Sequence, residues 1–533
     1  MAAAHPAENG DRPFKQATPV GGLKVATWNI AAVNNNPFEY WVTHDSAEYD
    51  KLMSDVETFL ENPGANDIPI EHIFTDAHWS ELASLLRAEF DGVDEVEKCW
   101  NDDLKHKKIV SGFLKDKMIG KKRLASMPDR ITNTIHTMSD SKPACRPTVI
   151  NNFQGDLTSV DKWWVQWKEF MFQRVLRVRT KKGAEDKRPC EMLEKICASK
   201  YPDVTPQEEA ISLPLQTLCQ AIFDCVWVHI LNTVSPTGSW LTLKRQICEH
   251  LVESKTQRII QILENCYSHF DVVFLQEVAA TFLDAVAANV VLAHPQNGFT
   301  CVFPERLDGK RDQNSMLLLS RRVFNPTTVE VTEHMLKSLR GQGKGGTPIN
   351  DGDLLCITCT DLQGSSYLLA SFHGDTNGLA TLPVVHTLAE YWTSLEGVNR
   401  LVVGLDANVY TGAANGYLDV SDFVAAYRSA GLTSCCGDDH QALSTNAKTT
   451  FNARTYLQPQ LNKAVRSSEK ESKGDNNPKD FILFHEKQMR VLQYCKDNTG
   501  SYEYLEGIPF PTLHFPSDHG VLAAQLAPLE TPA

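Results

Sequence analysis

Acidic, amide and imidazole side chains stand at the ends of six short apolar runs in this 533-residue chain. They are Asn29 after ATW, Glu277 after VVFLQ, His373 after LLASF, Asp406 and Asn408 in LVVGLDAN, Asp480 before FILF, and Asp518 and His519 before the last apolar run. One polar residue at a strand end is unremarkable, but six strand ends of a packed sheet cluster in space. Such a set can hydrolyse a phosphoester. Oxygen ligands hold Mg²⁺, a carboxylate orients and deprotonates water, and imidazole and amide donors stabilise the charged transition state.

The apolar runs beside these residues are short and rich in β-branched side chains, which predicts β-strands. One run, Leu23–Ile30, lies near the N-terminus, and the others follow at intervals from Asp271 onwards. They read LKVATWNI, DVVFLQEV, FTCVFPE, SMLLLS, DLLCITCT, SYLLASFH, RLVVGLDAN, KDFILF and GVLAAQL. Turns with Gly, Pro and Asn separate them, with helices between some, and this pattern is typical of an α/β sandwich.

Between about residues 38 and 270 the hydrophobic spacing is mainly helical. It predicts helices over Ala77–Phe90, Asp161–Val178 and Leu241–Phe270. The first strand is therefore separated from the others by more than 200 residues. Either that strand is incidental, or a helical domain is inserted into a β-rich one, and the motifs below favour insertion.

The longest apolar stretch, Leu213–Val234, carries Gln216, Gln220, Asp224 and His229. Because a membrane span has about 20 mostly apolar residues with few or no charges, we expect a buried amphipathic helix and no membrane span. Its apolar face would carry Leu218, Ile222, Cys225, Val226 and Ile230.

Composition narrows the class of protein. The chain is 42% hydrophobic and 22% charged, as in folded soluble proteins, and its net charge of −14 disfavours binding to DNA or membranes by bulk charge. Met1–Gly22 has no apolar stretch that could serve as a signal peptide. We therefore expect an intracellular protein, cytoplasmic or nuclear, whose 14 cysteines are free thiols. The single CxxC, Cys356 and Cys359, lies inside a strand-like run and is predicted to be structural.

Two segments of the helical part are locally basic. Asn101–Arg130 and Asp161–Cys190 each contain nine Lys or Arg and four Asp or Glu, and the second also holds Trp163, Trp164 and Trp167. Basic residues beside aromatic rings can bind nucleic acid through phosphates and base stacking. The alternative, a solvated basic face over a tryptophan core, is the one we favour.

The series TWN, LQE, FH, DxN, KDFI and SDH, in this order, resembles the endonuclease/exonuclease/phosphatase superfamily with the DNase I-like fold. The resemblance covers about Gly22–Asn36 and Asp271–Ala527. It implies a four-layered α/β sandwich, with two packed mixed sheets between helices and a large, mainly helical insertion after the first strand. We expect four segments: a flexible N-terminal segment (1–21), a discontinuous catalytic domain (22–37 and 271–528), the insertion (38–270) and a tail (529–533).

The resemblance also implies roles for the predicted site. Glu277 is the main Mg²⁺ ligand (Mn²⁺ can substitute), with Asn29 close to the metal and Asp518 able to reach one. Asp406 aligns the attacking water, and Asn408 binds the scissile phosphate. His519 contacts that phosphate and is oriented by Asp480. His373 donates to a phosphate oxygen. Whether one or two metals bind stays open.

Other positions are less specific. Asp375 and Asn377 in HGDTNG fit a turn or a substrate contact equally well, and Arg454 stands where relatives often carry a substrate-facing loop. The chain departs from the family at GLDAN, where Leu405 replaces the usual Gly directly before the acid and Gly404 stands one place earlier. It also has Phe481 where many relatives have Tyr.

The resemblance implies a Mg²⁺-dependent phosphoester hydrolase, in our prediction a nuclease or phosphodiesterase on nucleic acid or nucleotides. The alternative is a phosphatase of small metabolites, inositol phosphates or lipids. A non-catalytic binding module is a third hypothesis, disfavoured because Glu277, Asp406 and His519 are all present. The insertion could choose the substrate or dock a protein or RNA partner. Exo- or endonucleolytic mode and oligomeric state stay open.

Overall fold

The computed structural model describes residues 13–14, 19–124, 131–138, 142–180, 183–341 and 349–529. The chain forms two compact units. The sandwich unit consists of Met1–Val33, Ser254–Asn452 and Gly474–Ala533, and the helical unit of Asn34–Glu253 and Ala453–Lys473. The helical unit therefore takes up the segment 453–473, which the sequence placed with the catalytic domain. The expected domain boundaries themselves stay a prediction.

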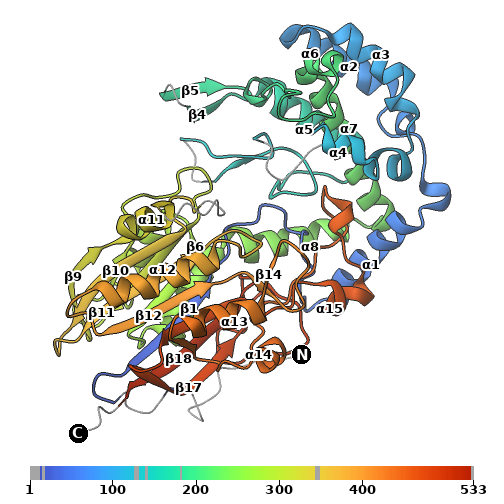
Figure 1. The fold of residues 1–533 in the computed structure, drawn as a ribbon. Coiled ribbons are helices and arrows are strands. Elements are labelled where there is room, and N and C mark those ends of the chain that lie inside the picture. Colours follow the sequence, from blue (N-terminus) through green and yellow to red (C-terminus); the bar gives the residue numbers. More distant parts are fainter. Residues whose placement is uncertain are drawn as a thin grey trace. The chain divides into compact units, whose positions relative to one another are not determined.

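The sandwich unit contains two six-stranded mixed sheets (Figure 1). The β1 sheet runs in the order β17 (Met489–Asp497), β18 (Val521–Pro528), β1 (Leu23–Asn29), β6 (Val272–Val278), β8 (Asn314–Ser320) and β7 (Phe299–Val302). The β12 sheet runs in the order β15 (Leu432–Ser434), β16 (Asp480–His485), β12 (Arg400–Asp406), β11 (Ser366–His373), β10 (Leu354–Asp361) and β9 (Phe324–Glu330). Each sheet has one parallel pair, β1 with β6 and β11 with β12.

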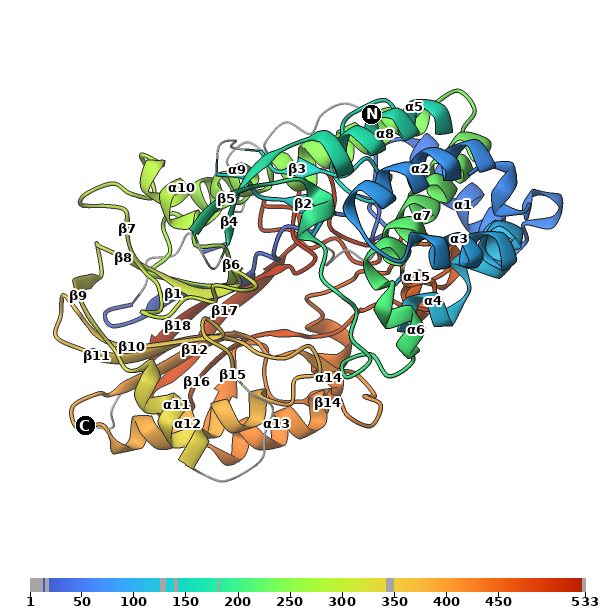
Figure 2. The same ribbon diagram turned by 90° about the horizontal axis from the view of Figure 1, so that it is seen from above.

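The two sheets pack face to face with helices outside, which makes four layers (Figure 2). The inner layer joins side chains of both sheets, such as Val25 and Phe274 from one and Ile357 and Ile482 from the other. The outer helices are α9 (Lys255–Ile262) and α10 (Phe282–Ala288) on the β1 sheet, and α11 (Thr332–Gly341), α12 (Thr381–Ser394), α13 (Val420–Ser429) and α14 (His440–Asn446) on the β12 sheet. The four-layered α/β sandwich predicted from the motif series is confirmed.

A buried polar side chain connects the sheets. Gln276 of β6 donates from Nε2 to Ser371 Oγ (3.0 Å) and to Thr27 Oγ1 (3.1 Å), and Ser371 Oγ donates to the carbonyl of Leu275. Every buried amide needs such partners, so these bonds fix how β6 faces β11. The Gln of the LQE motif is therefore structural.

Gly404 explains one departure from the family pattern. A Cβ at this position would lie 2.3–2.6 Å from atoms of Phe274, so only glycine leaves room for that ring between the sheets. We expect Gly404→Ala to lower the free energy of unfolding by about 1–3 kcal/mol, because overpacked cores must shift. Urea denaturation would measure it. Gly309→Ala, where nothing lies within 4 Å, is the control, and equal stability of both variants would contradict the expectation.

Asp271, directly before β6, gives a pH-dependent prediction. It is buried and accepts a hydrogen bond from Lys24 N at 2.7 Å, and burial raises the pKa of its carboxyl to about 6. An acid with a raised folded pKa contributes stability below its unfolded pKa, and this contribution is lost as pH rises through about 6. We therefore expect Asp271→Asn to add about 2–3 kcal/mol to the free energy of unfolding at about pH 8.

That gain should shrink steadily between about pH 6 and pH 4. Urea unfolding at a series of pH values checks it, with Asp284→Asn on the exposed face of α10 as the control. A gain that does not depend on pH would contradict the assignment of the effect to this carboxyl.

The helical unit is built around α7 (Ser212–Val234), and its other elements are α1 (Ala47–Glu61), α2 (Asp76–Glu89), α3 (Val93–Asp102), α4 (Lys117–Lys121), α5 (Val160–Lys168), α6 (Pro206–Ala210), α8 (Ser239–Cys248), α15 (Lys470–Lys473), β2 (Thr134–Ile135), β3 (Ala144–Cys145), β4 (Leu176–Thr180) and β5 (Gly183–Lys187). By length and composition α7 could cross a membrane, but 78% of that window is buried inside the protein. Its polar residues Gln216, Gln220 and Asp224 are buried too, so the predicted one-sided amphipathic pattern is wrong.

Two other helix predictions run too far. In the segment 161–178 the helix ends at Gln173. The rest of the segment belongs to β4, whose side chains alternate between buried and exposed. The segment 241–270 is divided at Ser254 into α8 and α9, with π-helical turns after each.

The tryptophans of the second basic segment belong to the core. Trp163, Trp164 and Trp167 are buried, with Trp164 and Trp167 stacked at 5.6 Å between ring centroids. They are therefore closed to nucleobases, as the favoured interpretation expected.

The remaining cysteine and terminal predictions can also be placed. Cys356 and Cys359 face opposite sides of β10, one toward the helices and one between the sheets, so they are structural. All 14 cysteines are free thiols. Within the predicted flexible segment, Phe14 is buried against Phe270, whereas residues 1–12, 15–18 and 530–533 lie outside the described part of the chain.

Candidate active site

The ends of β1, β6, β11, β12 and β16 bring the predicted side chains together. β1 and β6 are in register from Val25 to Asn29 in the β1 sheet. In the β12 sheet, Asp406 pairs in register with His373 on one side and with Asp480 on the other. The motif residues therefore meet because their strands are neighbours and the residues stand at matching ends of those strands.

Asn29 is the centre of the group. Its buried Nδ2 donates to Glu277 Oε1 at 3.1 Å and to Asp406 Oδ2 at 2.9 Å, while its Oδ1 accepts from Ala31 N. The amide thus holds a carboxylate of each sheet close to the other. The two carboxylates therefore share one amide donor, and carboxylate oxygens are the ligands that a hard cation prefers.

Glu277 is fixed by several further contacts. Its Oε2 accepts from Ala32 N at 2.8 Å and from Gln313 Nε2 at 3.0 Å. Its backbone φ is +56°, a left-handed conformation that is costly for a residue with a Cβ. Burial would raise the pKa of Glu277, but the positive charge of His373 and these hydrogen bonds hold it below its usual value. The carboxylate is therefore ionised at neutral pH.

Two histidines flank the carboxylates. His373 Nε2 lies 3.5 Å from Glu277 Oε1 and 3.7 Å from Asp406 Oδ2, and His519 Nε2 lies 3.7 Å from the same Asp406 oxygen. Burial would raise the pKa of Asp406, but the charges of His519 and His373 hold it below its ordinary value. Asp406 is thus an ionised carboxylate between two imidazoles.

His519 and Asp480 form a buried pair. His519 Nδ1 lies 2.9 Å from Asp480 Oδ2, which also accepts from the Thr449 hydroxyl at 2.6 Å. Burial lowers the pKa of His519, but the carboxylates of Asp480 and Asp406 outweigh it and raise the pKa to about 10. The imidazole is therefore protonated at neutral pH, and its Nε2 lies 3.7 Å from Asp406 Oδ2.

The backbone around His519 is anchored to β1. Its carbonyl accepts from Trp28 Nε1 at 2.9 Å, and Ser517 Oγ donates to the carbonyl of Asn29 at 2.6 Å. Asp518, between them in sequence, is half-buried, and its charge acts on His519 and on Lys255. The SDH motif thus connects the last strand of the chain to the first.

Asn408 lies in the same group of loops. It is buried with φ +48°, and its N–H donates to Asp406 Oδ1 at 2.9 Å. Asp375 accepts the N–H groups of Asn377, Leu379 and Ala380, so this acid holds the turn. The turn that HGDTNG allowed is therefore present, and a substrate contact by Asn377 stays a prediction.

Arg454 belongs to the helical unit. It pairs there with Glu39 Oε1 at 2.9 Å, and its guanidinium lies 5.6 Å from the ring centroid of Tyr40. Asp406, Asp480 and His519 also place ligand atoms within 4.8 Å of one another. Within the described part of the chain, Asp480 Oδ1 is buried without a hydrogen-bond partner, whereas both oxygens of Glu277 accept hydrogen bonds.

Sequence reasoning missed four supporting side chains: Gln313, Thr449, Lys255 and Lys479. Lys479 is buried, lies 2.6 Å from Asp475 Oδ2 and stands 4.5 Å from the ring centroid of Tyr410. Lys255 donates to the carbonyl of Ala32 at 3.2 Å. Lys479 directly precedes Asp480 in the KDFI motif, which was the available signal, whereas nothing local marks Gln313, Thr449 or Lys255.

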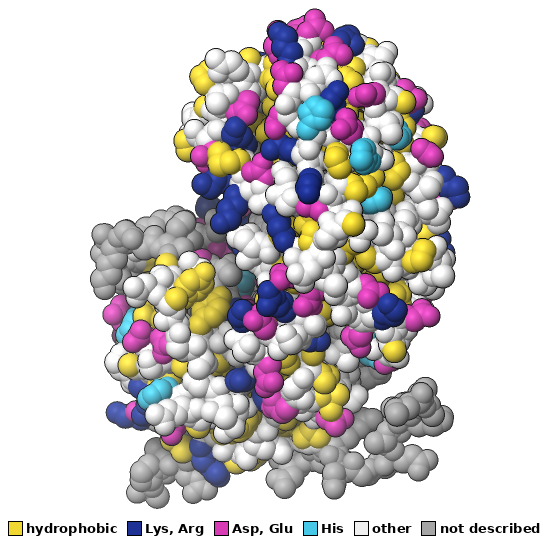
Figure 3. Space-filling model, turned by 90° about the vertical axis from the view of Figure 1, so that its right-hand side faces the viewer, with side chains coloured by type: hydrophobic (Ala, Val, Ile, Leu, Met, Phe, Trp, Pro, Cys, Tyr) yellow, Lys and Arg dark blue, Asp and Glu magenta, His cyan; other side chains and the backbone are white. Residues whose placement is uncertain are grey.

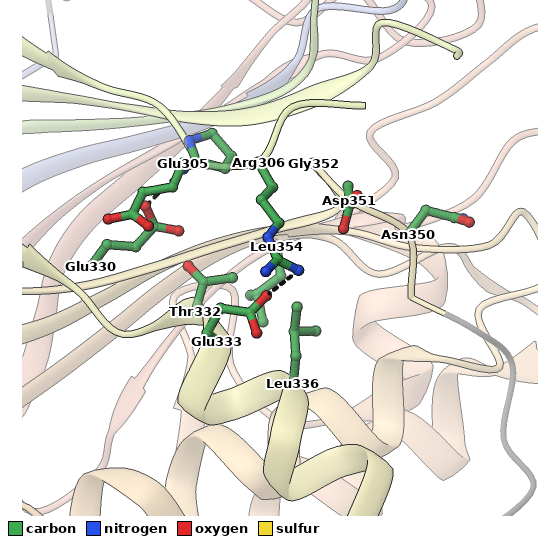
Figure 4. A pocket seen from close by; sticks show the side chains of 11 residues that line it. Glu305, Arg306, Glu330, Thr332, Glu333, Leu336, Asn350, Asp351, Gly352 and Leu354 are labelled. Atoms are coloured by element: carbon green, nitrogen blue, oxygen red, sulfur yellow. Dashed lines mark hydrogen bonds and ion pairs between the residues drawn. The ribbon is translucent and has the colours of Figure 1, made fainter. Parts of the chain in front are cut away.

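A separate small cavity of about 50 Å³ lies elsewhere in the sandwich unit (Figure 4). Glu305, Glu330 and Glu333 line it, and Arg306 reaches Glu333 at 3.2 Å. None of the predicted site residues lines it. Its acids are partly neutralised in place, and it is not the candidate site.

Comparisons with known proteins match the two units differently. Residues 67–245 match a family model described as a domain of unknown function, DUF8234. No curated protein matches the chain. Among solved structures, an endonuclease/exonuclease/phosphatase from Bacteroides vulgatus is similar at 14% identity, with a TM-score of 0.33 over 52% of this chain and 91% of that one.

Two further solved structures are similar to the same extent. The human Nocturnin catalytic domain with bound sulfate has 14% identity and a TM-score of 0.34 over 53% of this chain and 89% of its own. D. rerio TDP2 complexed with a single-strand DNA product has 12% identity and a TM-score of 0.33 over 52% and 92%. The function proposed for this chain therefore depends on the side chains of the site.

Proposed function

We propose that the sandwich unit is a metal-dependent phosphoester hydrolase that acts on nucleic acid or nucleotides. The observation that carries the proposal is the bridge from Asn29 to Glu277 and Asp406, flanked by His373 and the His519–Asp480 pair. The resemblance of the six motifs to the endonuclease/exonuclease/phosphatase superfamily supports it. The strained φ of Glu277 supports it too, because such strain is concentrated at functional sites.

The donor set fits Mg²⁺ or Mn²⁺. Glu277 offers the main carboxylate, Asp518 is a second acid nearby, and the amide oxygen of Asn29 would become a ligand if the amide turned from Ala31. A bound divalent ion supplies charge neutralisation for the phosphate and its leaving oxygen. Whether the site takes one ion or two stays part of the proposal.

The chain's own groups have distinct tasks. Asp406, ionised, accepts a hydrogen bond from the attacking water and takes up its proton. His519 donates its Nε2 proton to a phosphate oxygen as charge develops, while Asp480 keeps the ring in place. His373 donates to a second phosphate oxygen, and Asn408 binds the scissile phosphate.

The experiment is hydrolysis over one substrate panel, with and without Mg²⁺, for wild type and Glu277→Gln. The panel holds single-stranded RNA with and without poly(A), single- and double-stranded DNA, an abasic duplex, a dinucleotide and inositol phosphates. We expect hydrolysis of a nucleic-acid or nucleotide substrate that EDTA abolishes.

Glu277→Gln should raise the Mg²⁺ concentration needed for half-maximal rate, because an amide oxygen is a weaker ligand than a carboxylate. Glu396→Gln, an exposed position in the turn before β12, makes the same charge change away from the motif strand ends and is the matched control. Hydrolysis of inositol phosphates alone would favour the phosphatase alternative. An unchanged Mg²⁺ requirement in Glu277→Gln would refute the metal assignment.

A further inference from the structure

The helical unit contains a cavity of about 910 Å³. Two stretches far apart in sequence line it, 113–123 with α4 and 456–473 with α15, together with Glu61 of α1 and Phe223 of α7. Its size is at the upper end of ligand sites in proteins. None of the proposed catalytic residues lines it.

The lining is basic in an acidic protein. It contains six cationic and three acidic side chains, whereas the whole chain has a net charge of −14. The cationic ones are Lys115, Lys117, Lys121, Arg123, Arg466 and Lys473, and the acidic ones are Glu61, Asp116 and Glu469. Four of the six come from the basic segment 101–130. Lys and Arg side chains also gather in groups on the face that Figure 3 shows.

All three acids are already neutralised. Glu61 Oε2 pairs with Arg466 at 2.5 Å, and Glu469 pairs with Lys473 at 2.8 Å. Asp116 pairs at 3.3 Å with Lys107, which does not line the cavity. The positive excess therefore falls on the remaining cations.

Lys117 and Lys121 are two of the four remaining cations; of the others, Lys115 donates to the carbonyl of Leu60 and Arg123 lies over the ring of Tyr201. Lys117 and Lys121 stand four residues apart on α4, so they share one face of the helix, where like charges repel. Both are exposed, and neither forms an ion pair with any residue in the described ranges. Two unneutralised ammonium groups beside a cavity form a site for an anion.

Part of the cavity wall is apolar. Phe113, Ile119, Phe223 and Leu461 contribute to its wall, and Tyr456 directs its hydroxyl to Glu61 Oε1 at 2.6 Å. A ligand with phosphates at one end and a flat apolar group at the other matches both sides. Proteins that bind single strands combine basic grooves with apolar and aromatic surfaces in this way.

We propose that this cavity binds single-stranded nucleic acid, with phosphates on Lys117 and Lys121 and a base against the apolar wall. The inference rests on the proposed function for its substrate class. It assigns binding to the helical unit and leaves catalysis to the sandwich unit.

The test is equilibrium binding of the full chain to a fluorescein-labelled single-stranded RNA, in EDTA so that hydrolysis plays no part. Anisotropy is measured across a range of salt concentrations for wild type, Lys117→Gln/Lys121→Gln and a control. The control is Lys98→Gln/Lys195→Gln, which changes the same charge at two exposed positions of the same unit outside the cavity.

We expect Lys117→Gln/Lys121→Gln to bind the RNA about tenfold more weakly. The slope of the logarithm of the binding constant against the logarithm of salt concentration should be smaller by about 1.4, because each phosphate contact on a single strand contributes about 0.7. The control should match wild type. Equal affinity and slope in both double variants would overturn the inference. Displacement of the RNA by free inositol hexakisphosphate would also overturn the inference, because it would assign the cavity to a small anion.

The inference and the proposed function fail separately. Hydrolysis of a dinucleotide, too short to need the cavity, reports the sandwich site alone and should be unchanged in Lys117→Gln/Lys121→Gln. Binding that depends on the two lysines without any hydrolysis would refute the proposed function and keep the inference. Hydrolysis together with lysine-independent binding would do the reverse.

Discussion

His519→Ala is expected to lower kcat by about 10²–10⁴-fold, the usual contribution of a positioned proton donor. The side chain can be removed without loss of the backbone anchors, because Trp28 Nε1 bonds to the His519 carbonyl and Ser517 Oγ to its N–H. The backbone at 517–519 should therefore keep its place, although Asp480 loses its buried partner. Single-turnover hydrolysis of the substrate found in the panel measures the effect, with His440→Ala on α14 as the control.

The pH profile separates the roles of His519 and its partner. Burial and the two carboxylates together place the pKa of His519 at about 10, so the wild-type rate should stay high until the pH approaches that value. Asp480→Asn removes one of the two negative charges, and the alkaline fall in rate should then move to lower pH. If Asp480 had only a structural role, Asp480→Asn would lower the rate at every pH, and the alkaline fall in rate would stay at the same pH. Wild-type activity in His519→Ala would show that the site is assigned wrongly.

Asp224→Ala is expected to reduce the free energy of unfolding of the helical unit by about 3–5 kcal/mol, since it leaves a buried charge without its partner. Arg146 and Asp224 are both fully buried, with Arg146 Nε 2.7 Å from Asp224 Oδ2. The same carboxylate accepts from Trp167 Nε1 at 2.9 Å. The substitution would therefore take the carboxylate acceptor from Arg146 Nε and from Trp167 Nε1 together.

Urea unfolding followed by tryptophan fluorescence measures this loss. Asp156→Ala, which removes an exposed ion pair with Lys162, should cost less than about 1 kcal/mol. The double variant Arg146→Met/Asp224→Leu should recover most of the stability, because an apolar pair of similar volume needs no charge partner. If Asp224→Ala were as stable as Asp156→Ala, the pair would be unimportant for the fold.

The sequence was most informative where strands are buried on both faces. β1, β6, β11, β12 and β18 read as continuous apolar runs and were all predicted. β9, β15 and β17 were not, and all three are edge strands. An edge strand has one neighbour and mixes polar with apolar residues, as in the alternating burial of β17. Its sequence pattern is therefore hard to distinguish from that of a loop.

The site was predictable for the same reason. Polar residues that end apolar runs, such as Glu277 and Asp406, stand out against their surroundings. Thr449 and Lys255 have no such contrast, since a lone Thr or Lys reaches the site only through tertiary packing. The predicted helices were too long at two places. At Ser254 a π-helical turn precedes the break between α8 and α9, and at Leu176 the two-residue period of β4 begins.

The position of β1 between β18 and β6 has a consequence for how the protein is made. Leu23 pairs with Leu526, so β1 needs as its neighbour a strand that is synthesised about 500 residues later. Most of the helical unit is synthesised in between as one continuous stretch, Asn34–Glu253. During translation β1 therefore waits with an open edge, exposed to other chains, until β18 has emerged, and such open edges template aggregation.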